Sequence, residues 1–243
     1  MRGFLSGKRA FITGASKGIG LAVAQALALN GADVAICARN KADVEKSLDK
    51  LRDGAQSKVV GTTGDVSKSG DVVKMFEFVD KELGGLDILV NNAGIGIFRP
   101  AGELSVQEWD QVIGTNLSGA FYCTREALSR FAQARGGRII NISSLAGKNP
   151  FAGGSAYNAS KFGMNALSEV TMLDHRNDNV AVSYIMPGSV ATEFSGQESG
   201  NKGKADWKIA PEDIAEIVLS ILRMPERTLI SRIEVRPSRP QKN

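Results

Sequence analysis

Tyr157 and Lys161 lie four positions apart in the segment Tyr157-Asn158-Ala159-Ser160-Lys161. Side chains at this spacing share one face of a helix, so the lysine ammonium can act on the tyrosine phenol. A free tyrosine has a pKa near ~10. One positive charge about 4 Å away, at an effective dielectric constant of about 20, contributes roughly 4 kcal/mol. The spacing therefore predicts a phenol whose pKa is lowered toward neutrality, which suits a general acid or base.

Ser144 can join this pair although it is too far back in the sequence to share the helix. Glycine and proline are frequent between positions 147 and 154, so the chain can turn back there and bring the serine hydroxyl to face the phenol. Two hydroxyl groups placed in this way would hold a carbonyl or alcohol oxygen. We therefore take Ser144, Tyr157 and Lys161 as a candidate catalytic group.

A glycine-rich turn near the N-terminus offers a phosphate site. The apolar run 10–12 ends at Thr13-Gly14, and 19–29 has the composition of a helix. Backbone amides at the start of a helix bind phosphate groups, and Gly14, Gly18 and Gly20 carry no side chain that would block a pyrophosphate. The sequence thus predicts a strand, a dinucleotide-binding turn and a helix.

The second predicted strand, 33–38, indicates which dinucleotide binds. A cofactor with a free 2′-hydroxyl usually meets an acidic residue at the end of this strand, but here Ala38 is followed by Arg39. Arg39 and Lys17 can each donate charge-assisted hydrogen bonds to a 2′-phosphate, whereas an acid would repel it. This pattern predicts NADP(H) rather than NAD(H).

Three motifs together resemble one known family. Ser144, Tyr157 and Lys161, the turn Thr13–Gly20, and Asn91-Asn92-Ala93-Gly94 resemble the compact, single-domain branch of the short-chain dehydrogenase/reductase family, from about Lys8 to about Thr192. The regular alternation of strands and helices also predicts a doubly wound parallel sheet, of about seven strands with helices on both faces, in a Rossmann-like α/β three-layer sandwich.

The resemblance implies roles for particular residues. Tyr157 is expected to be the general acid or base, Lys161 to lower its pKa and bind the nicotinamide ribose, and Ser144 to hold the substrate oxygen. Asn116 is expected to hold a water in a proton relay, Asp65 and Val66 to contact adenine, and Thr192 to bind the carboxamide. The full set of expected cofactor-binding residues is Gly14, Ser16, Lys17, Gly18, Ile19, Gly20, Arg39, Asp65, Val66, Asn91, Ala93, Gly94, Tyr157, Lys161, Pro187, Gly188, Val190 and Thr192.

Length and composition favour a single domain, 1–243, with 42% hydrophobic residues. We expect a mobile substrate loop at about 188–210 and a basic, solvated C-terminal tail from about 236. No apolar run is long enough to span a membrane, and the net charge of +4 is spread along the chain without aromatic interleaving. We therefore expect a cytoplasmic protein that binds neither membrane nor nucleic acid. Cys37 and Cys123 are isolated, so we expect buried thiols and no metal site.

The predicted function is NADP(H)-dependent reduction of a carbonyl, or oxidation of the matching secondary alcohol. The alternatives are a nucleotide-binding regulator of the same fold without turnover, and a hydrolase that would depend on the single histidine, His175. Similarity to 3-oxoacyl-acyl carrier protein reductases extends to Arg135, but a second basic position falls at Asp178. The expected substrate walls are apolar: Ile95, Ile97, Phe98, Leu145, Phe151, Met186, Phe194 and Trp207. We expect a homodimer or homotetramer.

Overall fold

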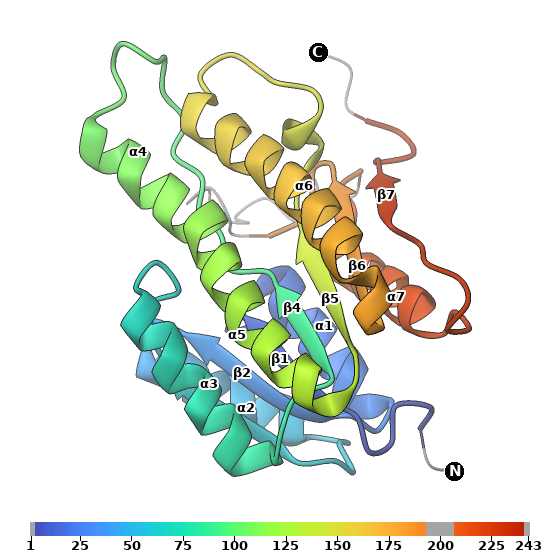
Figure 1. Ribbon diagram of the computed structural model, residues 1–243. Helices are drawn as coiled ribbons and strands as arrows, with labels where there is room; N and C mark the ends of the chain where they lie inside the picture. The colour runs from blue at the N-terminus through green and yellow to red at the C-terminus, as the bar shows by residue number, and fades with distance from the viewer. Residues whose placement is uncertain (1–2, 193–206, 241–243) are drawn as a thin grey trace.

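A seven-stranded parallel sheet forms the middle layer of the protein, as the sequence predicted (Figure 1). The computed structural model describes residues 3–192 and 207–240. The strands lie in the order β3-β2-β1-β4-β5-β6-β7, and each neighbouring pair is parallel. Their bounds are β1 Arg9–Thr13, β2 Asp33–Ala38, β3 Val59–Thr63, β4 Ile88–Asn91, β5 Gly137–Ile142, β6 Val180–Pro187 and β7 Arg232–Val235.

Helices cover both faces of the sheet. In the view of Figure 1, α3, α5 and α6 lie in front of the sheet and α1, α2 and α7 lie behind it. The bounds are α1 Gly18–Leu29, α2 Lys41–Arg52, α3 Ser69–Leu83, α4 Val106–Ile113, α5 Gly119–Ala134, α6 Ser155–His175 and α7 Pro211–Leu222. None of the helices in the described ranges is long and apolar enough to cross a membrane.

The buried strands supply both hydrophobic layers because successive side chains point to opposite faces. In β1, Ala10 and Ile12 belong to the cluster beneath α1, α2 and α7, whereas Phe11 packs against Phe76 in the cluster beneath α3 and α5. Strands covered on both faces are apolar throughout, which explains the unbroken apolar runs in the sequence. Cys37 and Cys123 are buried free thiols in the second cluster, as predicted.

Two elements depart from what their sequences suggest. The apolar run that leads into the last strand begins at Leu229, but β7 begins at Arg232, because pairing with β6 starts at Tyr184 opposite Arg232 and Leu229 is exposed. The helical segment that follows Ser105 is not continuous, because a π-helical segment, η1, at Gly114–Ser118 divides it into α4 and α5. Such π-helical turns frequently occur at functional sites.

Parallel strands place all their carboxyl ends at one edge of the sheet, where loops build a site. Among the described residues, no group of three or more His, Cys, Asp and Glu side chains could hold a metal ion. The expected loop 188–210 is described only at its two ends, which are joined by a bridge between Val190 and Ile209. Residues 193–206, including the expected wall residue Phe194, lie outside the described residues.

Candidate active site

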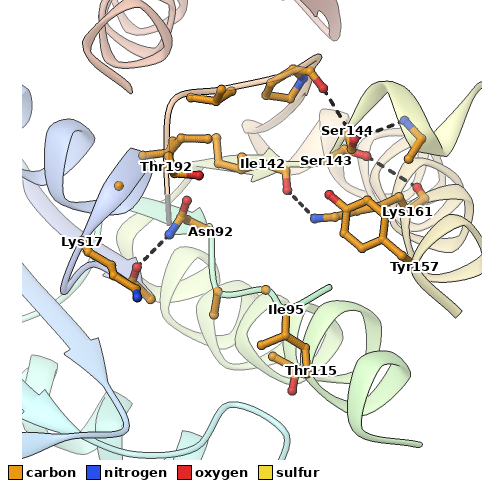
Figure 2. A pocket seen from close by; sticks show the side chains of 18 of the residues that line it. Lys17, Asn92, Ile95, Thr115, Ile142, Ser143, Ser144, Tyr157, Lys161 and Thr192 are labelled. Carbon is orange, nitrogen blue, oxygen red and sulfur yellow. Dashed lines mark hydrogen bonds between the residues drawn. The ribbon is translucent and has the colours of Figure 1, made fainter. Parts of the chain in front are cut away.

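Ser144 and Tyr157 meet because the chain turns back after β5. Ser144 begins the short helix η2, Leu145–Gly147, which packs directly on α6. A Cβ added to Gly147 would lie 2.7 Å from the Lys161 carbonyl oxygen, so only glycine permits this approach. The hydroxyl of Ser144 forms a hydrogen bond with that of Tyr157 and lies 3.5 Å from the Pro187 carbonyl, an alternative acceptor for its single proton. Figure 2 shows Ser144, Tyr157 and Lys161 gathered at one end of the pocket.

The ring of Tyr157 lies among other aromatic side chains. Its centroid is 5.5 Å from that of Phe98 and 6.5 Å from that of Phe151. Burial raises the pKa of the Tyr157 phenol above its ordinary value, although the hydrogen bond from Ser144 acts in the opposite direction. This is contrary to the lowered pKa that the sequence suggested. In the protein by itself, the phenol is therefore neutral at physiological pH.

Lys161 explains this difference. Its side chain is only 4% exposed, and burial lowers its pKa to about 8. The Nζ atom donates to the Ile142 carbonyl at 2.9 Å and lies 5.8 Å from the Tyr157 ring centroid. The sequence-based expectation placed a full positive charge about 4 Å from the phenol and left desolvation out. Burial disfavours the charged form of each group, and it is the largest cause of both pKa shifts.

Asn116 lies in η1 and is completely buried. Its Oδ1 accepts from the Ile95 amide at 2.8 Å, while its Nδ2 donates to the Ile95 carbonyl at 2.9 Å and to Ser160 Oγ at 3.0 Å. The side chain thus fastens the segment after β4 to α6 one position before Lys161. It does not line the pocket; its polar atoms are engaged in holding the pocket together.

The glycine-rich turn has the backbone shape expected for a phosphate site. Gly14 and Gly18 have φ angles of 63° and 58°, which favour glycine. The N-cap side chain of α1 makes no cap hydrogen bond, and Gly18 and Ile19 of the first turn line the cavity, so the helix start suits an anion. A Cβ added to Gly20 would lie 2.4 Å from Asn92 Nδ2. Gly20 therefore allows α1 to pack closely rather than forming the wall of the pocket.

Asn91 also acts within the sheet. It is 2% exposed, and its Nδ2 donates to Asn141 Oδ1 at 2.9 Å and to Thr124 Oγ1 at 3.1 Å. These contacts tie β4 to β5 and to α5, whereas the family resemblance implied contact with the cofactor. Like Gly20 and Asn116, Asn91 supports the pocket from behind.

The other predicted catalytic and cofactor-binding residues line one cavity of about 1010 Å³, which is large enough for a dinucleotide and a small substrate. They are Gly14, Ser16, Lys17, Gly18, Ile19, Arg39, Asp65, Val66, Ala93, Gly94, Ser144, Tyr157, Lys161, Pro187, Gly188, Val190 and Thr192. Of the expected apolar wall residues, Ile97 and Met186 do not line the cavity. Figure 2 shows Lys17 and Thr192 away from the catalytic end, with Asn92 between. The glycine turn, the cations and the cavity together fit a phosphorylated dinucleotide.

The charges at the far end of this cavity are mixed. Arg39 is exposed there, and Asp65 is close enough for its carboxyl to be influenced by the Arg39 charge. Burial favours protonation of Asp65, but hydrogen bonds from Ser67 and the attraction of Arg39 prevail and lower its pKa. Asp65 is therefore ionised at neutral pH beside the guanidinium.

Sequence reasoning missed several residues of the cavity. Lys208, Arg236, Pro237 and Pro240 line it, although the segment from about 236 was expected to be a solvated tail. Their sequence shows no motif. The pairing of β7 with β6 brings residues 236–240 there, and the bridge between Val190 and Ile209 brings Lys208. His175 pairs with Asp178 at 3.0 Å beyond the end of α6 and does not line the cavity, so the arrangement offers no serine–histidine pair for hydrolysis.

Comparisons with known proteins agree with this geometry. Residues 8–203 match the family model described as short chain dehydrogenase. The D-beta-hydroxybutyrate dehydrogenase of Cupriavidus necator is 39% identical over 189 residues, covering 77% of this chain and 72% of that enzyme. The alcohol dehydrogenase of the archaeon Thermococcus sibiricus, complexed with 5-hydroxy-NADP, superposes with a TM-score of 0.89 at 31% identity, covering 97% of this chain and 99% of that one. A metagenomic short-chain oxidoreductase in complex with NADP gives 0.84 at 34% identity, with the same coverage.

Proposed function

The chain belongs to the short chain dehydrogenase family of NAD(P)-dependent oxidoreductases, and we propose that it reduces a carbonyl group to a secondary alcohol with NADPH. The hydrogen-bonded pair of Ser144 and Tyr157 beside Lys161 carries this proposal, because it lies in the same cavity as the glycine turn. The same residues would act in the reverse oxidation, which needs a proton acceptor in place of a donor.

In this proposal Tyr157 donates a proton to the substrate oxygen. Its raised pKa keeps the phenol protonated at neutral pH, which is the form that reduction requires. Ser144 holds the substrate oxygen through its hydroxyl, next to the donor. Lys161, below its pKa of about 8, places a positive charge that stabilises the phenolate left behind. The nicotinamide cofactor, when bound, supplies the hydride.

The preference for NADP(H) rests on the two cations at the edge of the cavity. Lys17 and Arg39 both line it, and either can donate charge-assisted hydrogen bonds to a 2′-phosphate. Ala38 leaves no acid at the end of β2 to accept a ribose 2′-hydroxyl. The two similar structures named above, whose ligands are NADP or 5-hydroxy-NADP, support this preference.

The decisive experiment is an assay of a carbonyl panel with NADPH and NADH side by side. We expect turnover with NADPH, and we expect the Tyr157→Phe variant to lose it by at least about a hundredfold because general acid catalysis contributes on this order. Quenching of tryptophan fluorescence by NADPH should be almost unchanged in the variant, since the aromatic ring stays. Turnover retained by Tyr157→Phe would refute the assignment. NADPH binding with no oxidation across the panel would instead favour a nucleotide-sensing protein.

We also propose that the protein assembles as a homodimer or homotetramer through α5 and α6. Phe121 on α5 and Phe162, Val170 and Leu173 on α6 are each at least 44% exposed. Exposed apolar side chains gathered on neighbouring helices commonly mark a protein–protein interface. A second copy of this chain could bury them.

A further inference from the structure

Two cationic side chains in the cavity take no part in the mechanism described above. Lys208 and Arg236 line the cavity, and they flank the segment 187–190 from two directions. Lys208 precedes Ile209, which forms a bridge with Val190. Arg236 follows Val235, which pairs with Pro187. The two cations are therefore positioned by backbone pairing rather than by the ends of freely moving loops.

The segment that carries Arg236 packs against residues 187 and 188, which the catalytic serine also approaches. The amide of Gly188 donates to the Val235 carbonyl at 2.8 Å, and a Cβ added to Gly188 would lie 3.1 Å from Pro237 Cδ and 3.2 Å from Leu145 Cδ1. Gly188 thus packs between the C-terminal segment and Leu145, the residue that follows Ser144. Because the Ser144 hydroxyl lies 3.5 Å from the Pro187 carbonyl, and both Ser144 and Arg236 line the cavity, the two residues belong to the same wall of it.

The net charge of this wall is positive. Arg236 pairs with Glu234 at 3.1 Å, but Glu234 also pairs with Lys148, so one carboxylate is shared between two cations. Lys208 adds a further positive charge near the Trp207 ring. The acids that line the cavity within the described residues are Asp43 and Asp65, which follow β2 and β3 at the other end of the sheet.

The order of strands places these groups in a line along the carboxyl edge of the sheet. Phe98 follows β4, Ser144 follows β5, and Arg236 follows β7. Phe98 and Phe151 contact the Tyr157 ring and form an apolar wall on the β4 side. The catalytic hydroxyls therefore lie between an aromatic wall and a cationic one.

From this arrangement we propose that the substrate is a carbonyl compound that carries an anionic group, a carboxylate or a phosphate, bound by Arg236 and Lys208. The proposal rests on the reductase function proposed above. The carbonyl is held by Ser144 and Tyr157, and the apolar part of the substrate packs against Phe98 and Phe151. A guanidinium can donate two parallel hydrogen bonds to such an anion, so Arg236 is the stronger of the two contacts.

The test compares a 3-oxo carboxylate with its ethyl ester, which differ in charge but share the same carbonyl. The intact enzyme should have the higher kcat/KM for the acid. In Arg236→Gln, kcat/KM for the acid should fall about tenfold, as expected for the loss of a charge-assisted hydrogen bond, while that for the ester stays nearly constant. Lys208→Gln should act in the same direction. Arg239→Gln, three positions along the same segment but not lining the cavity, is the matched control.

A charge reversal makes the test sharper. Arg236→Glu should reject the acid and gain activity toward a ketone that carries a trimethylammonium group. Equal losses for acid and ester in Arg236→Gln would overturn the proposal, and so would a wild-type preference for the ester. A weaker Kd for NADPH in Arg236→Gln, with an unchanged ratio of acid to ester, would assign the cation to the cofactor phosphates and also overturn it. If neither acid nor ester is reduced, the reductase function itself fails.

Discussion

Burial shifts the pKa values of Lys161 and Tyr157 in opposite directions. Burial lowers the pKa of the lysine and raises that of the tyrosine, so both groups are moved toward neutrality. The tyrosine is then a proton donor throughout the physiological range, whereas the lysine loses its charge only slightly above it. The loss of reductase activity at high pH is therefore expected to follow the titration of the lysine, although the tyrosine donates the proton.

This difference predicts the pH dependence. Lys161 is an ammonium below a pKa of about 8 and a neutral amine above it, so kcat/KM for reduction should fall as the pH rises through about 8. Tyr157 remains protonated over that range because its own pKa lies above the ordinary value. The measurement is kcat/KM as a function of pH at NADPH concentrations below saturation, so that the profile reflects the pKa values of the free enzyme. Ser144→Ala should reduce the rate but leave the fall of kcat/KM at about pH 8 in place. A wild-type profile that stays flat to pH ~10 would contradict the assignment to Lys161.

At the scale of elements, η1 joins the segment after β4, which contains Ile95, to α6, which carries Tyr157 and Lys161. The π-helical turn brings Asn116 under Ile95, where its amide also reaches Ser160 on α6. The Ile95 amide, the Ile95 carbonyl and the Ser160 hydroxyl all form hydrogen bonds with the Asn116 side chain. The family resemblance implies a place for Asn116 in a proton relay, which stays a prediction; the structure shows that its side chain joins two elements.

Asn116→Ala should therefore destabilise the fold as well as slow the reaction. It leaves the Ile95 amide, the Ile95 carbonyl and the Ser160 hydroxyl without their partner. Each buried group left unsatisfied lowers the free energy of unfolding by about 1–3 kcal/mol. Thermal unfolding and kcat should both decrease. Asn30→Ala, which removes one part-buried hydrogen bond to the Ala26 carbonyl, is the control. Activity lost at an unchanged Tm would show that Asn116 serves the chemistry without serving the structure.

At the scale of the whole molecule, α4, α5 and α6 lie together on one side of the sheet and expose apolar side chains to solvent (Figure 1). Val106 and Trp109 on α4 add to those of α5 and α6. On their inner faces, by contrast, the helices that cover the sheet bury their apolar side chains in two clusters.

Charge placed on this surface should change the assembly. In Phe162→Glu combined with Leu173→Glu, the solution mass measured by light scattering should fall from that of a dimer or tetramer to that of a monomer, because burying a carboxylate in an apolar interface is costly. Val73→Glu alters an exposed apolar residue on α3 and should leave the mass unchanged. A wild-type protein that is already monomeric would contradict the proposed assembly.

Local patterns in the sequence determined the order of the strands and helices and the position of the glycine turn. Apolar runs, glycine spacing and the Tyr157–Lys161 interval act over a few residues, so they can be interpreted without knowing which segments meet. The same patterns also indicated Ser144, because glycine and proline between 147 and 154 predicted the turn that brings it to face α6.

Only the tertiary structure decided the quantities that depend on distant segments. The direction of the Tyr157 pKa follows from burial beneath Phe98 and Phe151, which no local pattern reveals. The cationic wall exists because β7 pairs with β6 and carries Arg236 back to the cavity, although in sequence that residue is part of a basic tail. Desolvation and strand pairing are set by how the whole chain packs, and this is why they could not be obtained from the residues themselves.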